Sequence, residues 1–137
     1  MRRQDVDLQV CSIARAMPLI GDSWTMLIIR GVFFGLHRFT ELQQSLDINR
    51  NRLTERLNLL VENDIMEKCL YDAARGRYEY RLTEKGTDLY PVLMSIVGWG
   101  DKWLADKDGP PLQYVHKTCS KVMQPKYHCD CCGAPLE

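Results

Sequence analysis

Apolar positions near the N-terminus recur every three or four residues, which is the spacing of amphipathic helices. The first such stripe is Val10, Ile13, Ala14 and Met17. We expect Pro18 and then Gly21 to close this helix. A second helix follows, which Asp22 or Ser23 can cap and which ends before Gly35. Its apolar stripe is Trp24, Leu27, Ile28 and Val32.

Two further helices with a tight turn between them are predicted next. The run Thr40-Glu41-Leu42-Gln43 fits a capping box, so a short helix begins at Thr40 and ends near Ser45 or Leu46. Asn49 is a suitable cap for the following helix. The apolar face of that helix is Leu53, Leu57, Leu60 and Val61. Its other face is polar and consists of Asn51, Arg52, Glu55 and Asn58, with Arg56 at the margin.

The apolar period changes from helical to alternating after this helix. Ile65 to Tyr71 is predicted to be one strand, and Ala73 to Gly76 forms the turn. In the second strand the inward positions are Tyr78, Tyr80 and Leu82, which alternate with Arg77, Glu79 and Arg81. The tip of this hairpin, Arg75-Gly76-Arg77, is basic.

A long apolar stripe follows, for which Thr83 is a suitable helix cap and in which Pro91 should cause a kink. Its members are Leu89, Val92, Leu93, Ile96, Val97, Trp103 and Leu104. Gly109-Pro110-Pro111 marks a boundary. We therefore predict a main domain over residues 8–107 and a cysteine-bearing tail over 108–137.

A short helix, a polar and basic second helix and a basic hairpin are the parts of a winged helix-turn-helix. The predicted fold is mainly α with a small β-hairpin as the wing. Such a domain places its second helix in the major groove of DNA. The base-edge candidates are Asn51, Arg52, Glu55 and Asn58, and the phosphate candidates are Arg38, Arg50, Arg56, Arg75, Arg77 and Lys85. Thr40 and Asn49, at the helix starts, complete the DNA-binding set. The alternative is a solvated charged helix face beside an ordinary hairpin.

Composition bounds the function without identifying it. The chain has 137 residues, 45% hydrophobic and 26% charged, which suits one globular domain with a small appendage. It contains no apolar run long enough for a bilayer and no secretory signal behind Met1-Arg2-Arg3, so we expect a cytoplasmic protein with no membrane partner. The formal net charge is zero, so a DNA-binding protein of this composition must segregate its charge.

An enzyme is not expected. The sequence has no glycine-rich phosphate loop, no nucleophile elbow and no convincing carboxylate pair. A cysteine enzyme would need a base beside its thiol, yet His37, His116 and His128 all fall outside the predicted core helices.

From about Val10 to Trp103 the chain resembles the HxlR family of bacterial winged-helix transcription regulators, relatives of the MarR group. The matching segments occur in the family's order and spacing, which is far more specific than any one of them. They are Cys11-Ser-Ile-Ala-Arg-Ala, Gly21-Asp-Ser-Trp24, Arg38-Phe-Thr-Glu-Leu42, Leu53-Thr-Glu-Arg-Leu57, Tyr78-Glu-Tyr-Arg-Leu-Thr-Glu-Lys-Gly86 and Trp99-Gly100.

The resemblance implies a homodimer built on long N- and C-terminal helices, with two recognition helices on a near-palindromic operator. Trp99 and Trp103 are also of the kind enriched at interfaces; the alternative is that the last helix folds back on its own domain. The chain departs from the family at Asp64, where glycine is usual. Since aspartate tolerates left-handed backbone better than most residues, we expect a small cost and an intact turn.

Cysteine chemistry offers two candidate switches. In some family members a cysteine near the start of the first helix senses oxidants or electrophiles, and Cys11 has that position, with Arg15 one turn away. The alternative for Cys11 is a buried small hydrophobe beside Ala14. Cys69, in a predicted strand, is expected to be inert.

The tail has the ligand spacing of a zinc site. His116-Lys-Thr-Cys119 is followed after nine residues by Cys129-Asp-Cys131-Cys132 and Gly133. His116, Cys119, Cys129 and Cys132 could supply one tetrahedral zinc ion, with His128 or Cys131 as substitute ligands. The alternatives are a redox pair or a disordered tail with loose thiols. The resemblance does not extend to this segment, and no cofactor is required by the family.

The sequence thus predicts a homodimeric operator-binding regulator. Its effector would be an oxidant or electrophile at Cys11, a small molecule at the dimer interface, or chemistry in the tail. The competing interpretation is a protein-interaction module in which a zinc-ribbon tail works on a winged-helix scaffold.

Overall fold

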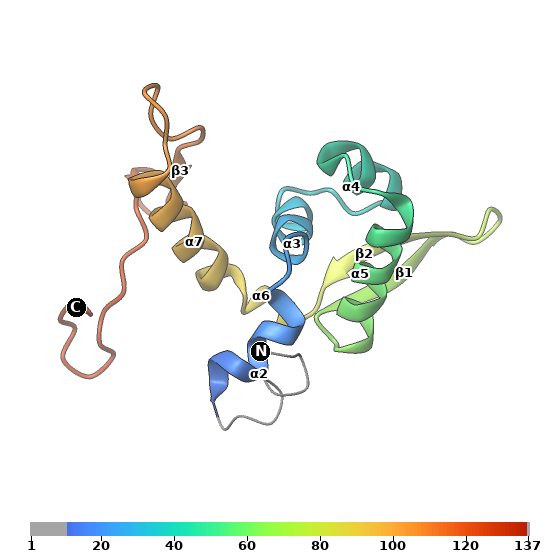
Figure 1. Ribbon diagram of the computed structural model, residues 1–137, viewed down its shortest axis with the longest axis horizontal. Coiled ribbons are helices and arrows are strands. Elements are labelled where there is room, and N and C mark those ends of the chain that lie inside the picture. The colour runs from blue at the N-terminus through green and yellow to red at the C-terminus, as the bar shows by residue number, and fades with distance from the viewer. Residues whose placement is uncertain (1–10, 137) are drawn as a thin grey trace. The chain divides into compact units, whose positions relative to one another are not determined.

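The computed structural model describes residues 11–136, and Figure 1 shows its helices and strands. The predictions for Val10 and for a domain start at residue 8 lie outside these residues. The chain divides into two compact units, one up to Leu89 and one from Tyr90 onward. The predicted domain boundary between residues 107 and 108 falls inside the second unit and stays a prediction.

The first two described helices are α2 (Ser12–Ile20) and α3 (Thr25–Phe33). Pro18 lies inside α2, which continues to Gly21, whose N–H donates to the carbonyl of Met17 at 2.8 Å. The N-cap position of α3 is Trp24, so neither predicted cap has it, but the side chain of Asp22 bonds the backbone at the start of the helix. Its Oδ1 accepts hydrogen bonds from the backbone of Trp24 at 2.9 Å and of Thr25 at 3.0 Å.

The helix-turn-helix consists of α4 (Phe39–Leu46) and α5 (Arg50–Glu62). The predicted capping box of Thr40 and Gln43 is wrong, because α4 begins at Phe39. The carboxylate that reaches back belongs to Glu41, three residues after Arg38, and it accepts the N–H of Arg38 at 3.3 Å.

The cap of α5 is confirmed. Asn49 accepts hydrogen bonds from the backbone of Asn51 at 2.9 Å and of Arg52 at 3.4 Å. The turn before it is made by Asp47, which has a left-handed backbone with φ of 50°, and by Ile48, which is buried. Aspartate tolerates this conformation better than most residues do, because its short polar side chain can form local hydrogen bonds. The direction of α5 is thus set by local hydrogen bonds and one buried anchor.

The wing is an antiparallel hairpin of β1 (Met66–Asp72) and β2 (Arg77–Leu82). Met66 pairs with Leu82 at its base, and the register shifts near the tip. Tyr80 is buried as predicted, and its burial raises the pKa of its hydroxyl. Tyr78, predicted to face inward, is exposed instead. In Figure 1 the tip of the hairpin extends to the right, beyond α4 and α5, and Leu70, Tyr71 and Tyr78 of its outer half are all exposed.

One hydrophobic core holds α3, α4, α5 and the base of the wing together. Four leucines of α4 and α5 are fully buried in it: Leu42, Leu53, Leu57 and Leu60. The other buried members are Ile28, Ile29, Val32, Ile48, Ile65, Met66 and Tyr80. Full burial of such side chains contributes about 1.5–3 kcal/mol each, so this core fixes α5 firmly.

The turn from α5 into β1 contains Asp64, with φ of 58°. The turn is intact, as expected for aspartate in place of glycine. The segment after β2 secures it: Thr83 Oγ1 donates to the carbonyl of Asp64, and Lys85 Nζ donates to that of Asn63 at 2.8 Å. Gly86 packs directly beneath this turn.

The single kinked helix predicted after Thr83 is wrong, because two helices are present. They are α6 (Glu84–Thr87) and α7 (Tyr90–Trp103). Pro91 has no N–H to bond the carbonyl of Thr87, and its ring would clash with that carbonyl in a continuous helix. As the second residue of α7, Pro91 is instead in a first turn, where proline is tolerated.

The second unit contains α7 and a tail with a short hairpin of β3 (Tyr114–Val115) and β4 (Val122–Met123). The hydroxyl of Tyr127 donates to the carbonyl of Pro91 at 2.7 Å and also contacts Ser95. The tail is therefore attached to α7 by polar contacts. No helix in residues 11–136 has both the length and the apolar character needed to cross a bilayer.

Candidate nucleic-acid interface

The solvent-facing side of α5 presents unpaired polar side chains. Asn51, Arg52 and Asn58 are exposed, while Leu53 and Leu57 on the opposite side are buried. No side-chain hydrogen bond or ion pair engages the guanidinium of Arg52 within residues 11–136. These groups are free to bind a ligand, and burial of the opposite face determines which way they point.

Arg56 is engaged differently. Its Nη1 lies 3.3 Å from Oδ2 of Asp22, and its Nη2 lies 2.9 Å from Oε1 of Glu55. Partial burial raises the pKa of Asp22, but hydrogen bonds from Thr25 and Trp24 together with the charge of Arg56 outweigh it, so that pKa is below its usual value. Arg56 thus ties α5 to the start of α3, and Glu55 is paired with it.

A basic groove lies where the starts of α4 and α5 meet the wing. We call it the wing groove. It has a volume of about 520 Å³ and is lined by Arg38, Phe39, Thr40, Arg50, Lys68, Tyr71, Gly76, Arg77, Tyr78 and Tyr80. Four of these residues are cations and none is acidic. Four of the 18 lysines and arginines of a chain with zero net charge therefore gather at one groove.

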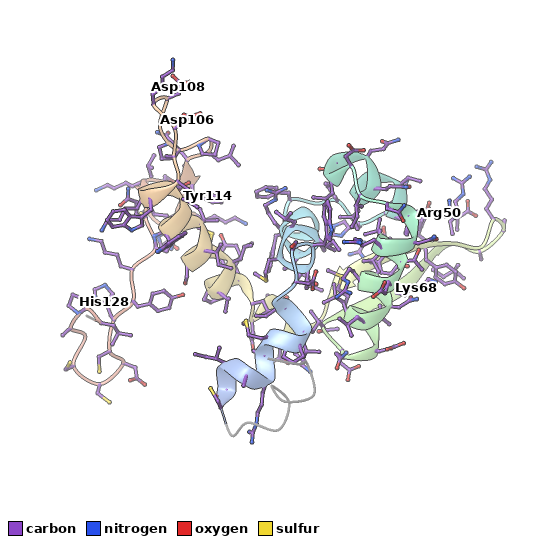
Figure 2. The ribbon with its side chains drawn as sticks, in the orientation of Figure 1. Arg50, Lys68, Asp106, Asp108, Tyr114 and His128 are labelled. Atoms are coloured by element: carbon purple, nitrogen blue, oxygen red, sulfur yellow. The ribbon has the colours of Figure 1, made fainter. Side chains whose placement is uncertain are left out.

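Aromatic rings hold three of these cations in place. Arg38 lies 4.4 Å from the ring centre of Tyr71, and Lys68 lies 4.5 Å from that of Tyr78. Arg50 lies 5.5 Å from the ring centre of Phe39, and Figure 2 labels it at the start of α5. Cation–π contacts orient a charge without neutralising it, so the cations stay available to an anion.

Backbone pairing brings Arg38 to the wing. The N–H of Tyr80 donates to the carbonyl of His37 at 2.7 Å. The backbone of Arg38 also pairs with that of Glu79 on β2, in an isolated antiparallel β-bridge. The segment before α4 therefore lies along β2. This contact places a residue of the helix-turn-helix in the same groove as residues of the hairpin.

Two wing arginines outside the groove lining have carboxylate partners. Arg81 bonds Glu79 at 2.6 and 2.9 Å, and Arg75 lies 3.9 Å from Asp72. The hydrogen bond from Arg81 lowers the pKa of Glu79, and the same bond raises the pKa of Arg81. Arg77, by contrast, lines the wing groove.

Sequence reasoning missed part of this site. Lys68 and the rings of Phe39, Tyr71 and Tyr78 were not among the candidates, although they build the groove. The hairpin register carried a usable signal, since Lys68 pairs opposite Tyr80 and Leu70 opposite Tyr78. Lys68 is therefore a diagonal neighbour of Tyr78 on one face of the hairpin, within reach of its ring.

The remaining predicted residues have mixed positions. Thr40 lines the wing groove, and the side-chain oxygen of Asn49 caps α5. Lys85 donates to a carbonyl at the base of the wing. Cys11 is exposed at the start of α2, and Cys69 on β1 is half-buried.

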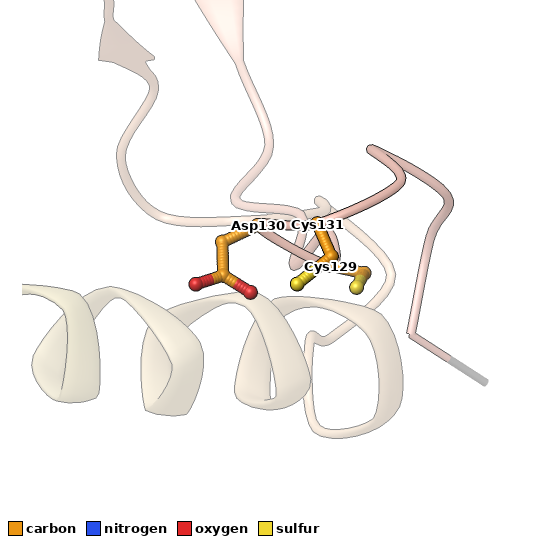
Figure 3. A group of neighbouring side chains, drawn as sticks. All are labelled: Cys129, Asp130 and Cys131. Carbon is orange, nitrogen blue, oxygen red and sulfur yellow. The ribbon is translucent and has the colours of Figure 1, made fainter.

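In the tail, the four predicted ligands occur as two pairs rather than one cluster. His116 Nδ1 lies 3.5 Å from Cys119 Sγ. The one group of three or more donors in residues 11–136 is Cys129, Asp130 and Cys131, with donor atoms within 4.8 Å of one another (Figure 3). Backbone N–H groups of Cys132 and Cys131 bond the sulfur of Cys129 and lower its pKa.

Comparison with known proteins decides the family. A family model described as HxlR-like helix-turn-helix matches residues 19–108. The chain belongs to the HxlR-like helix-turn-helix family. The match includes α4, α5, the wing and α7, and so covers every residue of the wing groove.

Relatives agree with this assignment. An uncharacterized HTH-type transcriptional regulator of Mycobacterium tuberculosis, Rv3095, is 41% identical over 125 residues, which are 91% of this chain and 79% of that protein. The crystal structure of PA1607, proposed to be a transcription factor, superposes with a TM-score of 0.87 at 34% identity, over 97% of this chain and 93% of the other.

The HTH-type transcriptional regulator YodB of Bacillus subtilis is also similar. It is 34% identical over 94 residues, or 68% of this chain and 84% of YodB. Solved structures of YodB include a reduced form, with a TM-score of 0.60 at 32% identity over 72% of this chain and all of that one, and a diamide-treated form. This HxlR-like protein is therefore a DNA-binding transcription regulator with a winged helix-turn-helix fold, and not an enzyme.

Proposed function

We propose that this protein is a homodimeric regulator that binds a near-palindromic operator, with one α5 in the major groove of each half-site. The observation that carries the proposal is the wing groove. Its lining contains four cations and no carboxylate, although the chain as a whole has no net charge. One of the four is Arg50, the first residue of α5. Such local charge attracts phosphates at the place where α5 would enter the groove.

The contacts divide by chemistry. Asn51, Arg52 and Asn58 have free polar groups on α5 and are assigned to base edges, where asparagine suits adenine and arginine suits guanine. Glu55 was predicted in the same set, and its pairing with Arg56 must break before it accepts from a cytosine amine. The groove cations and Arg75 at the wing tip are assigned to phosphates.

The surface of α7 supports the dimer. Val92, Ile96, Trp99 and Trp103 are exposed apolar residues spaced by four, three and four positions, which is the seam of paired helices. Trp99 is 61% exposed and Trp103 is 63% exposed. Tryptophans rarely remain so open in a monomer, and a second copy of α7 offers a matching stripe.

Cys11 is our candidate sensor. It is exposed, and its carbonyl accepts the N–H of Arg15 at 3.0 Å as α2 begins. An accessible thiol at a helix start is a setting in which oxidants and electrophiles react. The exposure of Cys11 contrasts with the burial of Ala14, which does not favour the interpretation of Cys11 as a core hydrophobe. Reduced and diamide-treated forms of the relative YodB are consistent with a redox-responsive regulator.

The test is equilibrium binding to the DNA upstream of the protein's own gene, compared with a random duplex over a range of salt. We expect tighter binding to the upstream DNA at every salt concentration. The logarithm of the association constant should fall linearly with the logarithm of the salt concentration. Equal affinity for both duplexes throughout would remove the operator proposal.

A matched pair of variants tests the role of the wing. Arg77→Ala should reduce the magnitude of the salt slope by about one, because one phosphate contact is lost. Arg81→Ala, on the same strand but bonded to Glu79, should change the slope less. Equal effects of the two substitutions would show that the groove does not hold the phosphates.

A further inference from the structure

Two loops in the tail have the same backbone geometry although their sequences differ. In the first, the N–H of Ser120 donates to the carbonyl of His116 at 2.7 Å, and the N–H of His116 donates to the carbonyl of Lys121 at 2.9 Å. Ser120 has a left-handed backbone with φ of 59°. The loop closes the hairpin of β3 and β4.

The second loop repeats each of these features. The N–H of Gly133 donates to the carbonyl of Cys129 at 2.8 Å, and the N–H of Cys129 donates to the carbonyl of Ala134 at 2.8 Å. Gly133 has a φ of 71°. In both loops the fifth residue is left-handed, the fifth N–H bonds the first carbonyl and the first N–H bonds the sixth carbonyl.

The candidate ligands occupy equivalent positions in the two loops. His116 and Cys119 are the first and fourth residues of the first, and Cys129 and Cys132 are the first and fourth of the second. Two turns of one design, each with a donor at its first and fourth positions, form the recurring framework of four-ligand zinc sites. Chance spacing of cysteines would not also reproduce the hydrogen bonds.

Donor geometry agrees with a tetrahedral ion. Zn–N and Zn–S bonds of about 2.05 and about 2.3 Å at a tetrahedral angle put the two donor atoms about 3.6 Å apart. Nδ1 of His116 and Sγ of Cys119 are 3.5 Å apart. In the second loop, backbone N–H groups of Cys131 and Cys132 bond the sulfur of Cys129 and so fix its position at the start of the loop.

The tail also needs a source of stability. Cys119, Cys131 and Cys132 are exposed, and residues 108–136 contribute no side chain to the buried core. The free energy of binding a structural metal is available to order a segment that cannot bury enough apolar surface. Three thiolates and one imidazole select zinc over calcium or magnesium.

We propose that His116, Cys119, Cys129 and Cys132 bind one Zn²⁺ per chain in a closed tetrahedral site. The two loops hold separate donor pairs in the structure, so binding requires them to come together around the ion, each supplying its first and fourth side chain. The role of the site is structural, because all four positions are filled by protein and none is left for a substrate. This proposal does not depend on the operator proposal.

The experiment uses the full chain purified without chelator. We expect about one equivalent of zinc per chain, and after replacement by Co²⁺ we expect the visible spectrum of a tetrahedral site with thiolate-to-metal charge transfer. A zinc content below roughly a tenth of an equivalent, with no such Co²⁺ spectrum on reconstitution, would overturn the proposal.

Single substitutions identify the ligands. Cys119→Ser and Cys132→Ser should each abolish the tetrahedral Co²⁺ spectrum, whereas the matched controls Cys131→Ser and Cys69→Ser should keep it. If Cys131→Ser abolishes the spectrum and Cys132→Ser does not, the cluster of Cys129, Asp130 and Cys131 is the site and the proposed ligand set is wrong. Circular dichroism of each variant distinguishes ligand loss from unfolding, since the helical core lies in the other unit.

Discussion

The three arginines of α5 differ in what holds them. Arg56 is bonded to two carboxylates, Arg50 lies over Phe39, and Arg52 has no side-chain partner in the described residues. We predict that Arg52→Ala weakens operator binding by about 1–3 kcal/mol and relaxes the preference at one base position. Binding to a library of single-base operator variants measures both effects. Lys107→Ala, an exposed cation in the second unit, is the control. An unchanged base preference would reassign Arg52 to a phosphate.

Asp22 is a stabilising residue rather than a DNA contact, because it bonds the N–H groups at the start of α3 and pairs with Arg56. We predict that Asp22→Ala lowers the free energy of unfolding by about 0.5–2 kcal/mol near neutral pH. The pKa of Asp22 is lowered on folding, so this stability is present above its unfolded value of 3.8 and disappears as pH falls through the folded value. Denaturant unfolding at neutral and acidic pH measures the difference.

The same experiment has an internal control. Asp22→Asn keeps an oxygen that can accept the N–H groups of Trp24 and Thr25 but loses the charge that pairs with Arg56. Its cost should be smaller than that of Asp22→Ala. A cost of Asp22→Ala that stays constant down to acidic pH would contradict the electrostatic part of this role.

Cys11 is the residue at which oxidation should act if the regulator is redox-responsive. We predict that treatment with diamide or a quinone weakens operator binding by the native protein and has no effect on Cys11→Ser. Cys69→Ser, which changes a half-buried strand cysteine, should respond like the native protein. An oxidant response retained in Cys11→Ser would transfer the switch to another thiol.

At the scale of elements, Gly86 sets how closely α6 approaches the turn between α5 and β1. A Cβ on Gly86 would lie 2.1 Å from the carbonyl oxygen of Ile65 and 2.9 Å from a methyl group of Leu82. Relief of this clash requires a shift of the backbone, which costs more free energy than a side-chain rotation. Gly86→Ala should therefore destabilise the fold by about 1–3 kcal/mol. Because the base of the wing shifts with it, operator affinity should fall as well. Chemical denaturation and binding measure the two effects.

Gly100 in α7 is the matched control for Gly86. A Cβ on Gly100 would meet nothing within 4 Å, and alanine is the better helix former. Gly100→Ala should therefore leave stability unchanged or raise it by about 0.5–1 kcal/mol. If Gly86→Ala proves as harmless as Gly100→Ala, α6 does not support the wing in the way described.

Element boundaries show where local pattern reaches its limit. The starts of α3 and α5 follow from Asp22 and Asn49, whose side chains bond their own neighbours, and such bonds are readable from sequence. The predicted start of α4 was wrong because two side chains, Glu41 and Gln43, could each accept a backbone N–H of the residue three positions earlier. Within residues 11–136, only the bond of Glu41 is formed. Pairing of His37 with β2 fixes the backbone ahead of α4, and that pairing joins residues far apart in the chain.

At the scale of the whole molecule, the dimer prediction concerns α7. The double substitution of Trp99→Ala and Trp103→Ala removes the two largest apolar side chains of its exposed stripe. We predict that the native protein is a dimer by sedimentation or light scattering, that the double variant is a monomer, and that the variant binds the operator more weakly because two half-sites are no longer linked. Leu112→Ala, an exposed apolar residue outside the stripe, is the control. A native monomer would exclude the dimer.

The sequence by itself determined the order and type of the elements of the winged helix-turn-helix. It did so because amphipathic periods, helix caps and turn residues act over a few positions. The buried face of α5 agrees with its predicted stripe, whereas in α3 Leu27 of the predicted stripe is exposed and Ile29, outside it, is buried. The polar face of α5 followed for the same reason. The family match over residues 19–108 then agreed with the ordered motifs from Gly21 to Gly100.

Only the tertiary structure decided which charges gather. The wing groove joins Arg38 and Arg50 to Lys68 and Arg77, residues up to 39 positions apart, across the junction of a helix-turn-helix and a hairpin. Tertiary packing likewise left Tyr78 beyond the core as a platform for Lys68, and local geometry gave the two tail loops one shape. Whether charges gather depends on the distances between them in space. A sequence pattern gives such distances only for residues that are a few positions apart in the chain.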